Sequence, residues 1–399
     1  MNRPNLATLK TCTGCLVCVD VCPKTALSKC IGEDGHIYIK CDESKCISCH
    51  KCEKVCPIVN EMKYSSNQLQ NSIPFSLYCT DKKLYDKSTS GGAFIAIALN
   101  FIKNGGYVCG VISDNEVKHT VTNNVDEVLK MQGSKYVQSD MSGIYKTISK
   151  LIDNGQKVLF TGMGCQAAAL NSYFKTNKNK ENLFIIDLIC GGVPSRLLSQ
   201  IFLQNERQYT KIEGFRNKNQ YVLSCYDTNG KLIYLKGQRV LPLYGFYSGL
   251  TMRYSCGDCR FCGIERMSDL TIGDYWGDNN GLHKSVAVAH TEKGIKILKC
   301  LNDVEINYID WSFIKCNPRF VVGKSYNNHK IQRLLLPWLF HNLSYKSLCG
   351  FYGCNLQNPL WLLLHIYNHS MVKIQKLYIK HQTKSILNSI TKNNSQPYL

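Results

Sequence analysis

The chain has 399 residues, a formal net charge of +19, 44% hydrophobic residues and 22 cysteines. Its hydrophobic content excludes a disordered protein, and its length predicts two or three domains. The N-terminal residues lack the apolar stretch of a signal peptide, and no apolar run approaches the roughly 18 residues of a membrane span. Because cysteines stay reduced in the cytoplasm, we expect a cytoplasmic protein.

Two copies of one cysteine pattern, C-x2-C-x2-C-x3-C-P, lie within residues 1–60. Bacterial ferredoxins with two 4Fe–4S clusters carry this pattern, and the fourth cysteine of each run ligates the other cluster. A zinc site uses two pairs of ligands instead, so we disfavour zinc and a disulfide knot. The pattern predicts one cluster on Cys12, Cys15, Cys18 and Cys56, and another on Cys46, Cys49, Cys52 and Cys22.

The segments around these runs indicate where the first module ends. Asp34-Gly35, flanked by strand-forming residues, predicts a hairpin within the ferredoxin module of residues 1–60. Residues 61–73 are rich in Ser, Asn and Gln, which is typical of a linker. We expect the second domain to span residues 74–150 and 151–325 as its two parts.

A glycine pair in the second domain precedes an apolar helix predicted over residues 93–102, and a strand predicted over residues 107–112 follows. Ser90, Gly91 and Gly92 stand at the start of that helix. Free backbone N–H groups at such a position suit a phosphate, although an ordinary helix cap explains the same residues.

Two predicted strands, residues 157–160 and 183–189, lead into loops that contain Cys165 and Cys190. A helix follows each loop, which is the arrangement of neighbouring strands in a parallel sheet. Open α/β sheets bind ligands at the carboxyl ends of such strands. The two cysteines are therefore either part of a site there or ordinary buried residues.

A third cysteine run, Cys256-x2-Cys259-x2-Cys262, cannot pack as three core residues on one face. It indicates half of a site that takes its other ligands from elsewhere. A hairpin is predicted before it over residues 221–226 and 231–235, and a strand after it within residues 268–277.

Five motifs in this order resemble the coenzyme F-420 hydrogenase/dehydrogenase beta-subunit family over roughly residues 75–320. They are Ser90-Gly91-Gly92, residues 133–139, Gly162-x-x-Cys165-Gln166, Cys190-x-Gly192-Val193-Pro194-Ser195 and residues 268–277. Many members of this family carry an N-terminal dicluster ferredoxin domain. The resemblance implies a flavin, FAD or FMN, and a third 4Fe–4S cluster.

The resemblance also implies which residues bind these cofactors. The third cluster falls on Cys165, Cys190, Cys256 and Cys259. The flavin pocket falls on Ser90, Gly91, Gly92, Lys135, Tyr136, Gln138, Ser139 and Asp274. Lys135 is a candidate for stabilising negative charge on the reduced flavin or its phosphate, and a surface lysine is the alternative.

Three residues depart from the family's pattern. Gly164 stands where a proline is usual, and Gly191 replaces a histidine, so any acid–base role of that histidine is absent. Cys262 stands where a non-ligand is usual and could replace one of the four cluster ligands.

The positive charge is concentrated in the C-terminal part, where residues 331–399 contain seven Lys or Arg and no Asp or Glu. Because the sequence contains none of the usual nucleic-acid-binding motifs, we expect no nucleic-acid partner despite this positive charge. Within a basic helical tail, residues 326–399, four lysines share one helical face: Lys373, Lys376, Lys380 and Lys384. Such a helix either contacts an anionic membrane surface or packs on its own domain.

The sequence thus predicts an α/β protein with a dicluster ferredoxin module and a mixed, partly parallel flavin and iron–sulfur domain. We expect a cytoplasmic oxidoreductase that passes electrons from the N-terminal clusters through the third cluster to the flavin, which acts on a small substrate. Its partner would be a redox protein or a small-molecule electron donor or acceptor. The alternatives are a non-catalytic electron-transfer subunit and a membrane-surface interaction protein.

Overall fold

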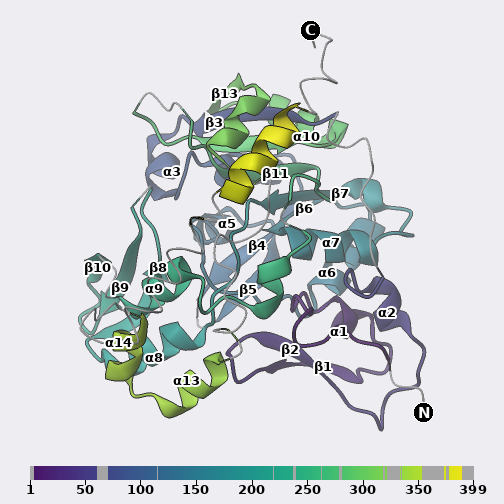
Figure 1. Cartoon of the computed structure of the whole chain (residues 1–399). Coiled ribbons are helices and arrows are strands. Elements are labelled where there is room, and N and C mark those ends of the chain that lie inside the picture. The colour runs from purple at the N-terminus through teal and green to yellow at the C-terminus, as the bar shows by residue number, and fades with distance from the viewer. Residues whose placement is uncertain are drawn as a thin grey trace.

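The computed structural model describes most of the chain (Figure 1). It covers residues 4–60, 71–114, 116–218, 220–236, 240–261, 263–277, 281–317, 320, 333, 335–352, 373 and 377–388. Figure 1 shows a large central sheet, a small module near the N-terminus on its lower right, and a second, smaller sheet on its lower left.

The N-terminal module is built from two short helices and a hairpin. Its elements are α1 Val17–Val21, β1 Leu27–Ile31, β2 Ile37–Cys41 and α2 Lys51–Val55. The hairpin confirms the prediction, since β1 and β2 pair antiparallel and Gly35 in the turn has a φ of 76°. Each helix is followed directly by the fourth cysteine of its run, Cys22 or Cys56.

The central sheet has eight strands in the order β13-β3-β12-β11-β7-β6-β4-β5. They are β3 Ile73–Cys79, β4 Tyr107–Ser113, β5 Val117–Thr122, β6 Val158–Met163, β7 Leu183–Leu188, β11 Leu270–Asp274, β12 Ser285–Ala289 and β13 Val304–Tyr308. The four strands β4, β6, β7 and β11 run parallel, whereas the other pairs are antiparallel. The predicted α/β class with a partly parallel sheet is confirmed, and both predicted parts of the second domain contribute strands.

Helices cover both faces of this sheet, because its central strands bury both of their faces. In β6, Leu159 faces the core with α4, α5 and α10, while Val158 and Phe160 face α6 and α7. The helices are α3 Lys82–Lys87, α4 Ala93–Lys103, α5 Val125–Lys130, α6 Ile144–Asp153, α7 Gly164–Tyr173 and α10 Glu292–Lys299, with the short turns η1 Lys180–Asn182 and η3 Trp311–Lys315.

A three-stranded sheet, ordered β10-β9-β8, stands beside the central one (Figure 1). The predicted hairpin forms its β9 and β10, with Gly230 in the turn at a φ of 75°. The elements of this region are β8 Tyr209–Gly214, β9 Val222–Asp227, β10 Leu232–Lys236, α8 Leu197–Asn205, α9 Leu241–Ser248, α13 Leu336–Asn342, α14 Tyr345–Tyr352 and the 3₁₀ turn η2 Tyr254–Asp258.

The N-terminal module shares its core with the central domain. Leu16 and Val17 are at most 1% exposed and belong to the same apolar cluster as α6 and α7. The buried carboxylate of Asp20 accepts hydrogen bonds from the backbone N–H groups of Gly143 and Tyr145, at 2.8 and 3.1 Å. It therefore satisfies the free donors at the start of α6 from across the interface.

Only part of the predicted basic tail, residues 326–399, is described. Residues 377–388 form a helix whose Ile386 and Leu387 pack against the core around Trp311. This packing favours a helix that covers its own domain, with Lys380 and Lys384 exposed. Lys376 and Lys392 lie outside the described residues, as does most of the predicted linker, residues 61–70.

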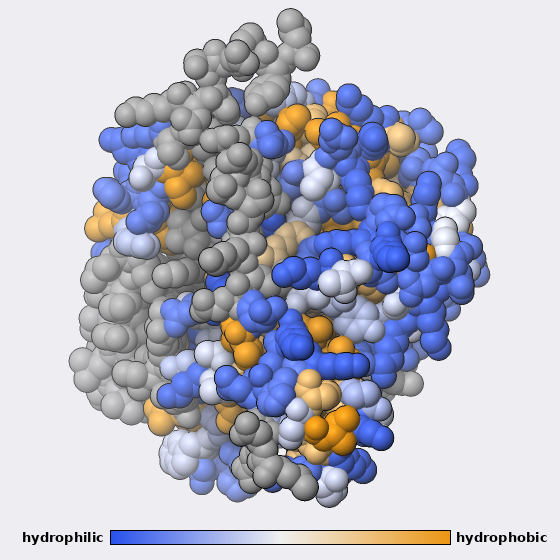
Figure 2. Space-filling view, turned by 90° about the vertical axis from the view of Figure 1, so that its right-hand side faces the viewer, coloured by the Kyte–Doolittle hydropathy of each residue, from blue (hydrophilic) through white to orange (hydrophobic). Residues whose placement is uncertain are grey.

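On the face drawn in Figure 2, the apolar residues of the described part of the chain form small separate groups among hydrophilic ones. In the described part of the chain, no helix is both long enough and apolar enough to cross a membrane.

Replacing Asp20 with Ala should weaken the docking of the N-terminal module. Two buried N–H groups would lose their acceptor, which costs about 1–3 kcal/mol in the free energy of unfolding. Urea unfolding of the anaerobic protein measures this loss. Asp86→Ala is the control, because its pair with Lys82 is exposed and should contribute less than about 1 kcal/mol. Equal losses in the two variants would contradict the role of Asp20.

Candidate functional site

The four cysteines predicted for the first cluster lie together. Burial, with smaller contributions from the neighbouring Cys12 and Cys56, raises the pKa of the Cys15 thiol to about 12. Burial also raises the pKa of Cys18, and the charges that add to this effect are those of Cys15, Cys12 and Cys56, followed by Cys52. Cys56 of the second run is therefore the neighbour of the first run, as the exchanged arrangement requires.

The four cysteines predicted for the second cluster line one small cavity. Cys22 from the first run and Cys46, Cys49 and Cys52 from the second are all among its lining residues. Cys49 is exposed, so this cavity lies near the surface of the module. The structure thus brings the cysteines together in the two sets that the sequence predicts.

The four cysteines predicted for the third cluster also converge. Cys165 stands at the start of α7, and Cys190 follows β7. Burial raises the pKa of Cys165, and Cys259, Cys190 and Cys256 raise it further. Burial, Cys259 and Cys190 raise the pKa of Cys256 to about 12. Cys262, the alternative ligand, lies outside the described residues.

These groups fit iron–sulfur clusters better than single ions. In the part of the chain that the structure describes, no three His, Cys, Asp or Glu side chains are close enough to hold one metal ion. A 4Fe–4S cluster spreads four thiolates over four irons, so its ligands need not converge on one point. Burial raises the pKa values of Cys15, Cys18, Cys165 and Cys256, so these thiols would become thiolates only with positive charge beside them, which irons would supply.

The cysteines predicted for the first, second and third clusters form three groups, which we call the first, second and third cysteine groups. They are neighbours in the order second, first, third. The charge of Cys52 acts on Cys18, so the second group is next to the first. The charge of Cys15 acts on Cys165, so the first group is next to the third. Tyr145 is close to both the first and the third group: burial raises its pKa most, and the charges of Cys15, Cys165 and Cys18 add to this effect. Its hydroxyl donates to the carbonyl of Cys15 at 2.7 Å.

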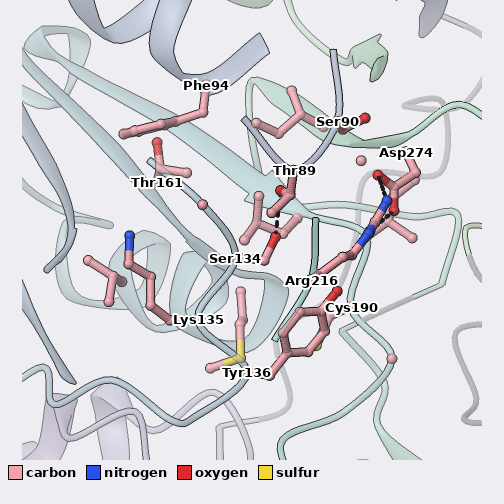
Figure 3. A pocket seen from close by; sticks show the side chains of 18 of the residues that line it. Thr89, Ser90, Phe94, Ser134, Lys135, Tyr136, Thr161, Cys190, Arg216 and Asp274 are labelled. Carbon is pink, nitrogen blue, oxygen red and sulfur yellow. Dashed lines mark hydrogen bonds and ion pairs between the residues drawn. The ribbon is translucent and has the colours of Figure 1, made fainter. Parts of the chain in front are cut away.

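A cavity of about 570 Å³ opens at the carboxyl ends of the parallel strands β4, β6, β7 and β11 (Figure 3). This is where open α/β sheets bind ligands, and the volume is typical of a cofactor or small-molecule site. Cys190, Gly191 and Gly192 line this cavity. Since Cys190 also belongs to the third cysteine group, that group and the cavity share one loop.

Six of the eight predicted flavin residues line the cavity: Ser90, Gly92, Lys135, Tyr136, Ser139 and Asp274. Gly91 is not among the lining residues. A Cβ on it would lie 2.4 Å from the carbonyl oxygen of Leu77, so close backbone packing explains this glycine. Gln138 is also outside the lining, and its side-chain amide donates to the carbonyl of Thr13 in the N-terminal module at 2.9 Å.

Lys135 borders the cavity but is not an exposed surface lysine. Its ammonium group donates to three carbonyls at the end of α5, those of Met131 at 2.7 Å, Gln132 at 2.6 Å and Lys130 at 3.3 Å. Burial lowers the pKa of Lys135 to about 7. Its hydrogen bonds thus tie the loop after α5 to the cavity wall.

Arg216 is a cavity residue that the sequence analysis missed. Its guanidinium donates to both carboxylate oxygens of Asp274, at 2.5 and 2.8 Å (Figure 3). It also lies against the rings of Tyr221 and Trp276, with centroids at 5.5 and 5.6 Å. Since Arg216 follows β8 and Asp274 ends β11, only the tertiary fold brings them together.

The glycine at position 164 has a steric cause. A Cβ there would lie 2.1 Å from the carbonyl oxygen of Phe261, so neither alanine nor the proline usual in the family fits this backbone. Gly191 lines the cavity, so the wall carries no imidazole at this position.

The fold and its cavity define a mixed α/β protein with three cysteine groups in series. Residues 155–310 match the family described as the C terminus of the coenzyme F420 hydrogenase/dehydrogenase beta subunit. The predicted family is thereby confirmed for this part of the chain, and the match supports an oxidoreductase in general terms.

A similar chain is found among solved structures, in the F420-reducing NiFe hydrogenase complex from Methanosarcina barkeri. It is 15% identical, with a TM-score of 0.47 over 70% of this chain and 92% of that one. No curated protein sequence matches the chain.

We expect Gly164→Ala to destabilise the third cysteine group. The added methyl would force the Phe261 carbonyl away from α7, and such overpacking costs about 1–3 kcal/mol in the free energy of unfolding. Urea unfolding measures the change. Gly350→Ala in α14 is the matched control, because its Cβ would meet nothing within 4 Å. A Gly164→Ala protein as stable as this control would contradict the close packing.

Proposed function

We propose that the protein is an iron–sulfur flavoprotein oxidoreductase that holds three 4Fe–4S clusters and one flavin, FAD or FMN. The observation that supports it best is the loop of Cys190, Gly191 and Gly192, which belongs to both the third cysteine group and the cavity. A cluster held there would lie directly beside a cofactor in the cavity, which is what electron transfer between them requires.

The proposed order of electron transfer follows the order of the cysteine groups. Electrons enter at the group of Cys46, because Cys49 is exposed to a redox partner protein or a small-molecule donor. They pass to the group of Cys12 and then to that of Cys165, each beside the next. A bound flavin would supply the conversion between single electrons and a hydride, which clusters cannot perform.

The residues of this chain would hold and orient the flavin. Helix α4 begins at the cavity, so its free N–H groups and positive dipole end suit the flavin phosphate. Arg216 is held in place by Asp274 and offers a fixed positive charge in the wall. The aromatic rings of Tyr136 and Phe246, 4.2 Å apart, provide an apolar surface beside it.

The iron content tests the number and membership of the clusters. The anaerobically purified protein should contain about twelve irons, four for each cluster. Cys165→Ala and Cys190→Ala should each lose about four, and Cys22→Ala should perturb the cluster of Cys46 rather than that of Cys12. Cys225→Ala is the control, because this buried cysteine belongs to none of the three groups. If Cys165→Ala keeps all its iron, the third site is wrong.

The full chain is needed for that measurement. Because Leu16, Val17 and Ile37 pack into the core of the central domain, removing the N-terminal module would expose that core. Single substitutions separate the three sites without this damage.

Substituting Gly92 tests the flavin site. Gly92 has a φ of 88° at the start of α4, so an alanine there is strained and shifts the N–H groups. We expect Gly92→Ala to bind FAD or FMN about tenfold more weakly, which corresponds to ~1.4 kcal/mol. Gly105→Ala has similar strain at the other end of the helix, in open space, and should bind normally. Fluorescence of the flavin released on denaturation gives the occupancy.

A substrate screen with the flavin-loaded protein completes the test. Reduction or oxidation of small molecules, a deazaflavin among them, would establish an enzyme. Turnover that occurs only with an added partner protein would point instead to an electron-transfer subunit, and a protein that neither contains nor takes up a flavin would exclude the enzyme.

A further inference from the structure

Arg253 joins the N-terminal module to the loop of the third cysteine group. It directly precedes the 3₁₀ turn η2, which carries Cys256, and its side chain is 1% exposed. It makes no ion pair with any described carboxylate. An arginine buried without a carboxylate needs other groups to compensate for the loss of water.

On one side, Arg253 contacts the N-terminal module. Its Nε donates to the carbonyl of Cys12 at 2.7 Å, and its Nη1 donates to the carbonyl of Ile37 at 2.7 Å. The guanidinium also lies over the ring of Tyr38, 4.4 Å from its centroid. The neighbouring Ser255 donates its hydroxyl to the same carbonyl of Cys12 at 3.0 Å. Two hydrogen bonds to the carbonyl of Cys12 thus attach the first cysteine group to the segment that contains Arg253 and Ser255.

On the other side, Arg253 contacts the third cysteine group. Its backbone carbonyl accepts the N–H of Cys256 at 2.9 Å, and its own N–H donates to the carbonyl of Val193 at 2.8 Å. Val193 lies in the loop that follows Cys190, so one residue connects Cys12, Cys256 and that loop.

One nitrogen of the Arg253 guanidinium has no hydrogen-bond partner among the described residues. Nη1 also donates to the side-chain oxygen of Gln138 at 3.0 Å, whereas the buried Nη2 has no hydrogen-bond partner among the described residues. A buried donor without an acceptor is costly, so this position suits a further acceptor. A cluster on Cys12 would place negative charge beside the guanidinium, and a cluster on Cys256 would lie next to the backbone of the same residue.

We propose that Arg253 is a positioning residue that holds the first and third clusters at a fixed separation and raises the reduction potential of both. The inference rests on the proposed function, since it requires the two clusters. Reduction adds an electron to a cluster and increases its negative charge. A buried positive charge beside it stabilises the reduced form, and net charge and hydrogen bonds are among the factors that set cluster potentials.

Redox titration followed by EPR spectroscopy tests this role in the full chain, purified anaerobically. The variants are Arg253→Met and Arg253→Gln, which remove the charge, and Arg253→Lys, which keeps it. We expect both neutral variants to shift the potentials of the first and third clusters to more negative values, with the second cluster much less affected. Arg253→Lys should keep both potentials close to their wild-type values, which a merely structural role would not predict.

Lys29→Gln is the matched control. Lys29 forms an ion pair with Asp140 across the same interface, and its side chain is 42% exposed, so it is screened by water. Removing this charge should leave all three potentials unchanged. A shift as large in Lys29→Gln as in Arg253→Met would show a general effect of the interface and would overturn the proposal.

The remaining outcomes also decide the question. Unchanged potentials in the neutral variants, or a lysine variant shifted as far as the methionine variant, overturn the role of the charge. If the neutral variants hold no iron in these two clusters while Arg253→Lys does, the charge is needed to assemble the clusters, which supports the positioning role of Arg253. If Arg253→Lys also holds none, while Lys29→Gln does, Arg253 serves packing alone. A wild-type protein without iron would instead refute the proposed function itself.

Discussion

The parallel pairing of β6 with β7 is the constraint on which the rest of the site depends. It aligns Val158 with Leu183 and Met163 with Leu188, so both strands end at the same edge of the sheet. The loops that follow therefore bring Cys165 and Cys190 to one place, although 25 positions separate them in the sequence. The same edge opens into the large cavity, because β4 and β11 are parallel to this pair and end there too.

A second constraint is the shared core between the N-terminal module and the central domain. Ferredoxin-like modules can be joined to an enzyme by a flexible linker, and their distance from the next redox centre then varies. Here the apolar side chains of Leu16 and Val17 are buried against α6 and α7, and Asp20 caps α6. The first and third cysteine groups are consequently held as neighbours by packing and hydrogen bonds.

The cavity wall combines fixed charge with aromatic surface. Arg216 is held by two hydrogen bonds to Asp274 and by two rings, so its guanidinium has little freedom to move. Such preorganisation lowers the entropic cost of binding an anionic or aromatic group. Lys135 contributes differently, since its donors are used by the carbonyls at the end of α5. Arg216 thus faces the cavity, whereas Lys135 supports its wall.

The sequence by itself determined the local patterns. The doubled cysteine run, the hairpin at Asp34-Gly35, the helix after Gly92 and the strands before Cys165 and Cys190 all depend on residues close together in the chain, and their spacing is visible there. The tertiary structure alone decided which distant residues meet. Gln138 contacts the N-terminal module rather than the cavity, and Gly91 packs against the backbone of β3. Arg216 and Arg253 form hydrogen bonds with residues 58 and 241 positions away in the sequence. Contacts of this kind follow from the order of strands in the sheet and the docking of the module, and no local spacing records them.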